Sequence, residues 1–316
     1  MISRVRWGAS RPSTSWHWRL AILAHIAVLF TIADSRAAAV TGTNGNDTLF
    51  FQGVLQQVTT NVINAYSGQS VSINDLYNVN TATYDGLGGT DTLLLTNVND
   101  FLTIRNGNGN QTLFNVENIV AGNGSDVINL SDSSIVLGNL FINGGSQDDI
   151  LWGNAGNDTI QGVDGNDNIR GGPGNNVLNG GNGNDILNGG GGNDTVTGDA
   201  GNDTLFFAKA ENAGVVLYNG GTGTDGLVLQ LTPAEAAAAA ADIVAANAFI
   251  AANYNTTASN GPSYTFNSFG LTFSNVESLQ EDVVPEPSTW AMLSVGSAAL
   301  FAIRRRQGRN LLVSPK

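Results

Sequence analysis

Acidic residues recur every nine residues through the centre of this chain. From Gly144 to Phe206 the sequence divides into seven consecutive nonapeptides, and the sixth position of each is Asp, or Asn in one case. These position-six residues are Asp149, Asp158, Asp167, Asn176, Asp185, Asp194 and Asp203. Carboxylate and carbonyl oxygens are the ligands that hard cations such as calcium prefer. Their regular spacing therefore predicts the binding of a divalent cation.

The distribution of charge also favours a cation as partner. Between residues 40 and 303 the chain has 25 acidic side chains and three basic ones, which are Arg105, Arg170 and Lys209. Such a segment repels nucleic acid, and we expect no nucleic-acid partner. A merely acidic surface, as in halophilic proteins, would not place its acids at a fixed spacing.

Several kinds of catalytic and metal site are excluded by composition. The chain has no Cys, and its two His residues, His17 and His25, lie close to the N-terminus. Thiolate sites are therefore excluded. If the N-terminal segment is cleaved, a Ser-His-Asp triad and a His-ligated zinc are excluded as well.

The other positions of the nonapeptide predict a turn followed by a short strand. Position one is Gly in all seven copies, position four is Gly in all except Gln147, and position eight is always aliphatic. Gly, Asn and Asp in the first six positions tolerate positive φ and favour a sharp turn. Positions seven to nine form a minimal strand that points one side chain into a core. One such unit buries almost nothing, so stability has to come from stacked neighbours.

These nonapeptides resemble the RTX repeat, G-G-x-G-x-D-x-U-x, a calcium-binding repeat. The resemblance implies an all-β fold, a parallel β-roll or β-solenoid with one coil per 18 residues. It also implies calcium between turns stacked on the same side, held by position-six carboxylates and turn carbonyls. One edge would stack Asp149, Asp167, Asp185 and Asp203, and the other Asp158, Asn176 and Asp194. We expect weaker calcium binding at Asn176, because an amide lacks the carboxylate charge.

Electrostatic repulsion predicts that the repeat needs its cation in order to fold. Adjacent strands lie about 4.8 Å apart, so stacked carboxylates would be comparably close. Two like charges at that distance repel by about 1 kcal/mol in water, and by a few kcal/mol at an effective dielectric near 20. Without calcium we expect a disordered Gly- and Asn-rich segment.

The flanks of the repeat read as β-rich, with one helix. Further nonapeptides lie at 42–50, 86–94, 121–129 and 220–228, and the segment 114–119 recurs at 274–279. We predict that both of these segments are strands that extend or cap the solenoid. Their acids, Glu117 and Glu277, could be catalytic, but acids in such places more often satisfy a turn or a strand edge.

An alanine-rich segment after residue 231 predicts the helix. Thr232 to Glu235 form a capping box with Pro at the first helical position. The helix is expected to run to about Ala252, to contact the roll through Ile243, Val244, Phe249 and Ile250, and to cover one end of the solenoid.

The N-terminus has the plan of a secretory signal peptide. A basic, acid-free leader covers residues 1–19, an apolar run covers 20–33, and three alanines occupy 37–39. The apolar run is shorter than the roughly 20 residues that span a bilayer. We predict cleavage near Ala39 and therefore export.

The C-terminus has the plan of a membrane-processed sorting tail. Val284 begins the sequence VPEPSTW, which is followed by an apolar segment and by three arginines at 304–306. Arginines after an apolar segment place that end in the cytoplasm. The order of these features resembles the PEP-CTERM tail of exopolysaccharide-secreting Gram-negative bacteria. The resemblance implies transient membrane insertion and an exosortase that recognises Pro285, Glu286 and Pro287.

These features predict five segments. They are a signal peptide at 1–39, a β-rich flank with scattered repeats at 40–143, the RTX roll at 144–228, a helix and strand cap at 229–283, and the sorting tail with a short transmembrane segment at 284–316.

The predicted function is that of a non-enzymatic, calcium-binding protein, secreted or held at the cell surface or outer membrane. It would fold on calcium outside the cytoplasm and serve a structural or adhesive purpose, with exopolysaccharide as a candidate partner. The alternative is a lyase, epimerase or glycosidase that carries RTX repeats, for which Arg105 with Tyr84 is the one pair to nominate. A toxin or hydrolase exported by the type I route fits poorly, because such proteins resemble this chain only in the repeat.

Overall fold

The computed structural model describes the central part of the chain. The described residues are 38–50, 53–63, 70–80, 82–104, 111–135, 137–212, 214–253 and 261–284. The predicted signal peptide, apart from its last two residues, lies outside them. So do Arg105 and the sorting motif Pro285, Glu286 and Pro287.

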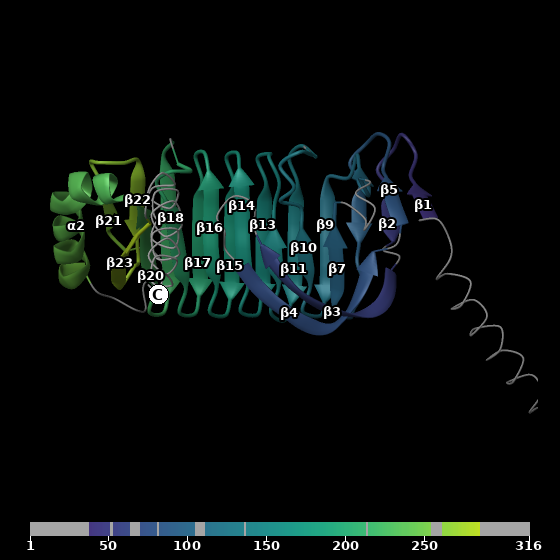
Figure 1. The fold of residues 1–316 in the computed structure, drawn as a ribbon, viewed down its shortest axis with the longest axis horizontal. Helices are drawn as coiled ribbons and strands as arrows, with labels where there is room; N and C mark the ends of the chain where they lie inside the picture. Colours follow the sequence, from purple (N-terminus) through teal and green to yellow (C-terminus); the bar gives the residue numbers. More distant parts are fainter. Residues whose placement is uncertain are drawn as a thin grey trace, which may run out of the picture. The chain divides into compact units, whose positions relative to one another are not determined.

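Two long, mainly parallel sheets form the fold, and the chain alternates between them (Figure 1). Sheet one contains, in spatial order, β2 (Thr48–Phe50), β6 (Thr92–Leu94), β9 (Asn118–Asn123), β11 (Phe141–Ser146), β13 (Thr159–Asp164), β15 (Val177–Asn182), β17 (Thr195–Ala200), β19 (Val216–Thr222), β22 (Leu271–Ser274) and β21 (Ser263–Thr265). Sheet two contains β3 (Gly53–Ile63), β4 (Ser70–Asn80), β7 (Asp100–Thr103), β10 (Val127–Asn129), β12 (Ile150–Trp152), β14 (Asn168–Pro173), β16 (Ile186–Gly191), β18 (Thr204–Ala208), β20 (Gly226–Leu231) and β23 (Ser278–Val283). A small third sheet contains β1 (Ala38–Thr41), β5 (Ala82–Asp85) and β8 (Leu113–Phe114).

The strand register shows the 18-residue coil that the resemblance implied. In sheet one Ile142 pairs with Ile160 and Ile160 with Leu178, while in sheet two Leu151 pairs with Ile169. Each step is two nonapeptides. The predicted parallel β-solenoid is therefore confirmed.

Coils outside the repeat are longer but belong to the same two sheets. The step from Ile119 to Ile142 is 23 residues, and the step from Val196 to Tyr218 is 22. The scattered nonapeptides thus supply further rungs, and the extra residues are accommodated in the turns. Strand pairing continues across residues 144 and 228 without interruption.

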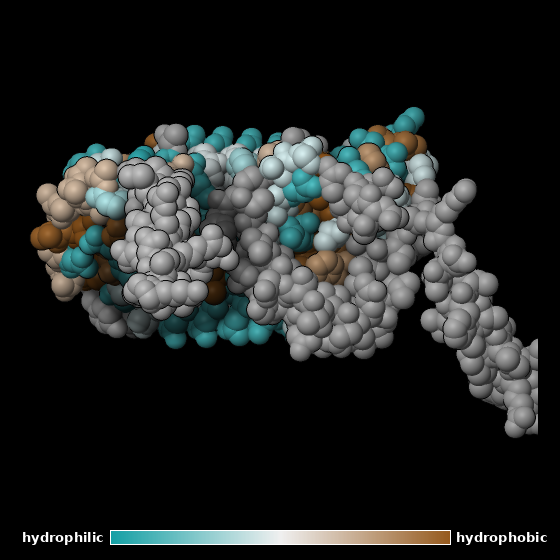
Figure 2. All heavy atoms as spheres, viewed as in Figure 1, coloured by the Kyte–Doolittle hydropathy of each residue, from teal (hydrophilic) through white to brown (hydrophobic). Residues whose placement is uncertain are grey.

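Within the repeat, each strand contributes one aliphatic side chain to a narrow core between the two sheets. All seven position-eight residues of the repeat are buried, with at most 1% of the side chain exposed. They are Leu151, Ile160, Ile169, Leu178, Leu187, Val196 and Leu205. Polar residues line the edge of the solenoid where the coils turn (Figure 2). Each coil buries little surface alone, so neighbouring coils stabilise one another.

Helix α2 (Pro233–Asn253) lies at one end of the sheets and packs on β20 and β23 (Figure 1). The predicted capping box is present, because the Glu235 N–H donates to Thr232 Oγ1 and the Thr232 N–H donates to Glu235 Oε2. The helix is long and apolar enough to cross a membrane, yet one of its faces is buried against the solenoid. That face presents Ala239, Ile243, Ala246 and Ile250.

One predicted helix contact is wrong. Val244 is 70% exposed, because consecutive residues of a helix are about 100° apart and Val244 therefore points away from the buried side of Ile243.

The prediction that the recurring segments at 114–119 and 274–279 are strands is wrong, because residues 115–117 and 275–277 form turns that join β8 to β9 and β22 to β23. Asn115 and Asn275 adopt positive φ in these turns, 48° and 49°, which an extended strand does not allow. Asn118 opens β9, and Phe273 pairs with Tyr218 in sheet one. Leu279 pairs with Leu227 in sheet two. A hairpin of β3 and β4 interrupts the rungs between β2 and β6 and joins sheet two where Asn78 and Val79 pair with β7.

Candidate calcium sites at the coil turns

The position-six residues stand in two columns, one at each edge of the solenoid. Edge one consists of the turns that lead from sheet one into sheet two. In the repeat these turns hold Asp149, Asp167, Asp185 and Asp203. Edge two consists of the turns that lead from sheet two into sheet one, and in the repeat they hold Asp158, Asn176 and Asp194. All seven are buried, with 1% exposure each.

A hydrogen-bond ladder connects the residues of edge one. The N–H of Asp149 donates to Oδ1 of Asp167 at 2.7 Å, and the N–H of Asp167 donates to Oδ1 of Asp185 at 2.8 Å. The same bond joins Asp185 to Asp203 at 2.8 Å. One carboxylate oxygen of each residue is thus used to bind the preceding coil, which fixes the side chain in place.

The ladder of edge one extends beyond the seven nonapeptides in both directions. Asp126 donates its N–H to Asp149, and Asp100 donates its N–H to Asp126. At the other end Asp203 donates to Asp225, and Asp225 donates to Glu277 Oε2. The sequence analysis did not include these residues among the candidate ligands. The signal was present for two of them, since Asp126 and Asp225 occupy position six of the scattered nonapeptides 121–129 and 220–228.

The second carboxylate oxygen along edge one is buried and, among the described residues, accepts no hydrogen bond. This holds for Asp126, Asp149, Asp167, Asp185, Asp203 and Asp225. A buried charged oxygen without a partner costs several kcal/mol or more. These six atoms therefore require either protonation or a cation.

The position-one glycine of each repeat opens space beside that oxygen. A Cβ placed on Gly144 would lie 2.5 Å from Asp149 Oδ2 and 2.9 Å from the carbonyl oxygen of Gly162 in the next coil. A Cβ on Gly162 would overlap Asp167 Oδ2 and the Gly180 carbonyl in the same way. A carboxylate oxygen and a carbonyl oxygen thus converge between successive coils.

Burial raises the pKa of every carboxyl group in the edge-one ladder from Asp126 to Asp225. The pKa of Asp149 rises to about 9, and the pKa of Asp126, Asp167 and Asp203 rises to about 7. The main cause is desolvation, which the backbone hydrogen bonds oppose only in part. Without a cation the carboxylates are therefore held in an environment that disfavours their charge.

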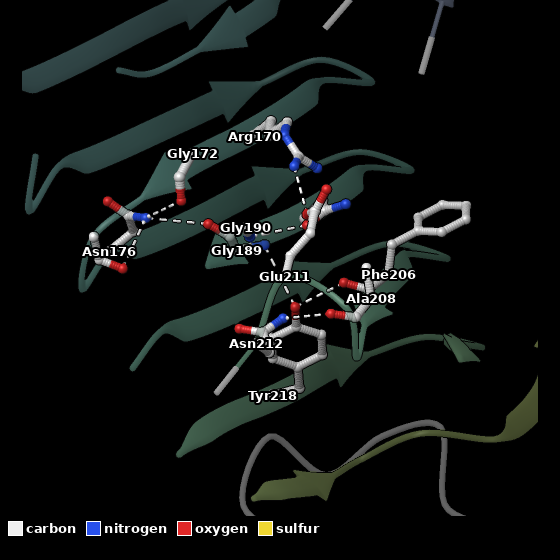
Figure 3. Close-up of polar contacts among 12 residues, drawn as sticks. Arg170, Gly172, Asn176, Gly189, Gly190, Phe206, Ala208, Glu211, Asn212 and Tyr218 are labelled. Atoms are coloured by element: carbon white, nitrogen blue, oxygen red, sulfur yellow. Dashed lines mark hydrogen bonds and ion pairs between the residues drawn. The ribbon is translucent and has the colours of Figure 1, made fainter. Parts of the chain in front are cut away.

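Edge two has different contacts within the repeat. Asn176 uses its oxygen to accept the Asp158 N–H at 2.9 Å, while its Nδ2 donates to the carbonyls of Gly172 and Gly189 at 3.0 and 3.1 Å (Figure 3). The amide nitrogen, rather than an oxygen, therefore faces the carbonyls at this turn. That arrangement differs from the weak calcium site predicted at Asn176.

Asp158 also has a donor for its second oxygen. The Asn154 N–H donates to Asp158 Oδ2 at 3.1 Å. With its amide oriented to accept the Leu137 N–H at 2.7 Å, Asn154 Nδ2 donates to Asp158 Oδ2 at 3.0 Å and to the Gly138 carbonyl at 3.2 Å. Side-chain amides thus bridge neighbouring oxygens at two successive turns of edge two.

At Asp194 the nearby charge comes from an arginine. Its Oδ2 is buried without a hydrogen-bond partner among the described residues. Burial raises the pKa of Asp194 to about 6, and the positive charge of Arg170 opposes that rise. Arg170 is buried and pairs with Glu211 at 2.5 Å (Figure 3).

The two glutamates considered as catalytic acids take part in the ladders. Glu117 Oε2 accepts the Asp91 N–H at 2.8 Å, and Glu277 Oε2 accepts the Asp225 N–H at 2.7 Å. Each therefore satisfies a backbone donor at the edge of a sheet. Tyr84 is fully buried in the core.

The donor set of edge one fits calcium. Among the described residues no three acidic side chains lie close enough together to hold a metal ion by themselves. The ligands that each turn offers are instead one carboxylate oxygen and main-chain carbonyl oxygens. Calcium accepts six to eight such oxygens in flexible geometry. The orphaned Oδ2 atoms and the space beside the position-one glycines are the two observations that support this fit.

Comparisons with known families agree with this geometry. Residues 141–169, 161–196 and 170–205 match the RTX calcium-binding nonapeptide repeat, with four copies. Residues 283–306 match the PEP-CTERM protein-sorting motif. No curated protein and no solved structure shows significant similarity to the chain.

Proposed function

We propose, for a chain that carries RTX calcium-binding repeats and a PEP-CTERM sorting motif, that it folds on calcium after export and serves a structural or adhesive purpose. Its place would be the cell surface or the exopolysaccharide matrix. The chain is an exported calcium-binding protein on the evidence of the two matched motifs. Folding on calcium, adhesion and the polysaccharide partner are the parts that we propose.

The observation that carries the proposal is the column of buried, unpartnered carboxylate oxygens on edge one. In calcium-poor cytoplasm these oxygens oppose folding, and the chain remains in a state suited to export. Outside the cell, calcium binds the folded state and not the unfolded one, so the binding free energy becomes folding free energy. We propose Asp126, Asp149, Asp167, Asp185, Asp203 and Asp225 as its ligands, together with Asp194 on edge two.

The sorting tail supplies the route to the surface. We propose that the N-terminal segment is removed as a signal peptide. An exosortase would then recognise Pro285, Glu286 and Pro287 while the apolar tail is inserted in the membrane. The folded solenoid is thereby left outside the cell, where a multivalent cation can also bridge acidic polysaccharide to its acidic surface.

The polysaccharide-active enzyme gains no specific support. A cavity of about 270 Å³ lies beside α2 and is lined by Phe249, Ile250, Asn253, Gly261, Pro262, Asn275 and Val276. None of these side chains is an acid or a base. Neither matched motif is a catalytic domain.

A calcium titration of the full chain tests the proposal, with far-UV circular dichroism and hydrodynamic radius as readouts. We expect a compact, β-rich state in calcium and an expanded chain in chelator. Magnesium at equal ionic strength is the control, because it keeps its water ligands and prefers a smaller octahedral site. An identical folded signal in chelator and in calcium would refute calcium-dependent folding.

The proposed adhesion to exopolysaccharide is tested by a separate measurement. Cells that display the full chain are assayed for retention on purified exopolysaccharide, with and without calcium. Retention only with calcium supports the matrix function, whereas equal retention by cells that lack the protein would contradict it.

A further inference from the structure

The two edges of the repeat differ in whether their buried oxygen atoms have a hydrogen-bond donor. On edge one each buried Oδ2 faces a carbonyl with no proton donor between them among the described residues. At two turns of edge two a side-chain amide donates to these oxygens instead. Asn176 Nδ2 donates to the carbonyls of Gly172 and Gly189, and Asn154 Nδ2 donates to Asp158 Oδ2 and to the Gly138 carbonyl of the preceding coil. A donor in that place satisfies the oxygens that a cation would otherwise ligate.

The amide of Asn176 is the clearest case (Figure 3). A Cβ on Gly171 would lie 2.6 Å from Asn176 Nδ2 and would also overlap the Gly189 carbonyl. In the edge-one turns the equivalent space lies beside an aspartate Oδ2, as at Gly144 and Asp149. Asn176 Nδ2 thus occupies the position of the missing carboxylate oxygen and donates to the carbonyls itself. Its orientation is fixed because its oxygen accepts the Asp158 N–H.

At the turn of Asp158 the amide comes from a different residue and satisfies the carboxylate oxygen itself. Asn154 supplies both its main-chain N–H and its amide to Asp158 Oδ2, and the amide reaches the Gly138 carbonyl as well. Gly138 precedes the nonapeptide block, and Asn154 is the second residue of its nonapeptide, a position that is Gly in four of the seven copies. The amide donor is therefore specific to this nonapeptide and is not part of the common repeat pattern.

We infer that calcium is bound along edge one and that the turns at Asp158 and Asn176 are metal-independent, closed by the amides of Asn154 and Asn176. The inference rests on the proposed calcium function and narrows it to named turns. It replaces the sequence-based prediction of calcium at Asp158 and Asn176, while Asp194 on edge two remains a proposed ligand. The metal-independent turns would hold adjacent coils in register while the calcium column is still empty.

Calcium stoichiometry of matched variants tests this inference. The full chain is equilibrated with calcium by dialysis, and the bound metal is counted per chain for the wild type and for three variants. Asp167→Asn and Asp158→Asn make the same isosteric change at position six, one on each edge. We expect Asp167→Asn to lose about one calcium ion and Asp158→Asn to lose none, since only the first removes an unpartnered ligand.

Asn176→Asp is the gain-of-function variant. It replaces the amide donor with a carboxylate oxygen beside the Gly172 and Gly189 carbonyls, so we expect about one additional calcium ion per chain. Circular dichroism in saturating calcium shows whether Asp167→Asn folds. If it does not fold, the calcium count of Asn176→Asp still tests the inference.

The outcomes separate this inference from the function on which it rests. Equal calcium loss in Asp158→Asn and Asp167→Asn, or no gain in Asn176→Asp, would overturn the inference while calcium binding stands. A wild-type chain that binds no calcium would overturn the proposed function and the inference together.

Discussion

At the scale of single residues, the glycines of the nonapeptide serve two separate purposes. Position four adopts positive φ in six of the seven copies, as at Gly165 with φ of 132°, and the one residue there that is not glycine, Gln147, adopts 79° and keeps the turn. Position one has ordinary φ, and its glycine is required because a side chain would fill the space beside the aspartate Oδ2. Only the first purpose follows from backbone preferences.

A prediction at this scale concerns Gly162→Ala. The added methyl group would occupy the space beside Asp167 Oδ2, so we expect calcium affinity at that turn to fall at least about tenfold, or about 1.4 kcal/mol. Calorimetric titration measures the change. Gly45→Ala is the matched control, because its Cβ would meet only Thr43 Oγ1 at 3.6 Å. Equal weakening in both variants would argue against a metal beside position one.

At the scale of elements, each strand of the repeat is stable only through its neighbours, whereas α2 contributes a recognisable buried face. Ala239, Ile243, Ala246 and Ile250 recur at helical spacing and face β20 and β23. The sheets would otherwise end at this side with an uncovered rung, which is a site for association with other chains. The helix therefore belongs to the packing of the solenoid even though its composition resembles that of a membrane span.

The helix offers a paired test. Ile243→Ala should lower the free energy of unfolding in saturating calcium by about 2–4 kcal/mol, because it leaves a cavity against the sheet. Val244→Ala should change it by less than about 0.5 kcal/mol, since that side chain is 70% exposed. Urea unfolding monitored by circular dichroism measures both. Equal effects would show that α2 packs differently from the structure.

At the scale of the whole molecule, the acidic edge couples folding to calcium and to pH. The raised pKa values of about 6 to 9 along edge one mean that the calcium-free folded state binds more protons than the unfolded state above roughly pH 4. Stability of the calcium-free fold is therefore greatest below the unfolded pKa and is lost as pH rises through the folded pKa. Calcium requires the deprotonated carboxylates, so its effect has the opposite sign.

This coupling predicts a reversal of the pH dependence. In calcium-free buffer the full chain should be more compact at pH 5 than at pH 8. In calcium it should be compact at pH 8, with weaker calcium affinity at pH 5. Hydrodynamic radius and calcium titration at both pH values measure this. A calcium-free chain that is better ordered at pH 8 than at pH 5 would contradict the assigned burial of the edge-one carboxyls.

Local sequence patterns were sufficient to predict the repeat, its 18-residue coil and the resemblance to calcium-binding β-rolls. Residues nine positions apart have the same environment, so a residue's place in the nonapeptide predicts its structure. The burial of Leu187 follows from position eight, and the positive φ of Gly165 follows from position four. The helix start at Thr232 was equally local, because a capping box is made by residues three apart.

Which turns have a buried oxygen without a hydrogen bond could not be predicted from local patterns, because it depends on contacts between coils. Asn176 lies at position six, where the sequence predicted a weak calcium ligand, and Asn154 lies at position two. The function of both amides depends on carbonyls of other coils, such as that of Gly189. The extension of edge one to Asp100 and Glu277, which occupy position six of no nonapeptide, likewise depended on coils whose turns differ in length. Stacking brings together residues 18 to 26 positions apart in most coils, and 52 to 55 positions apart in the coil that contains α2. The hydrogen bonds formed there are set by the register of the coils.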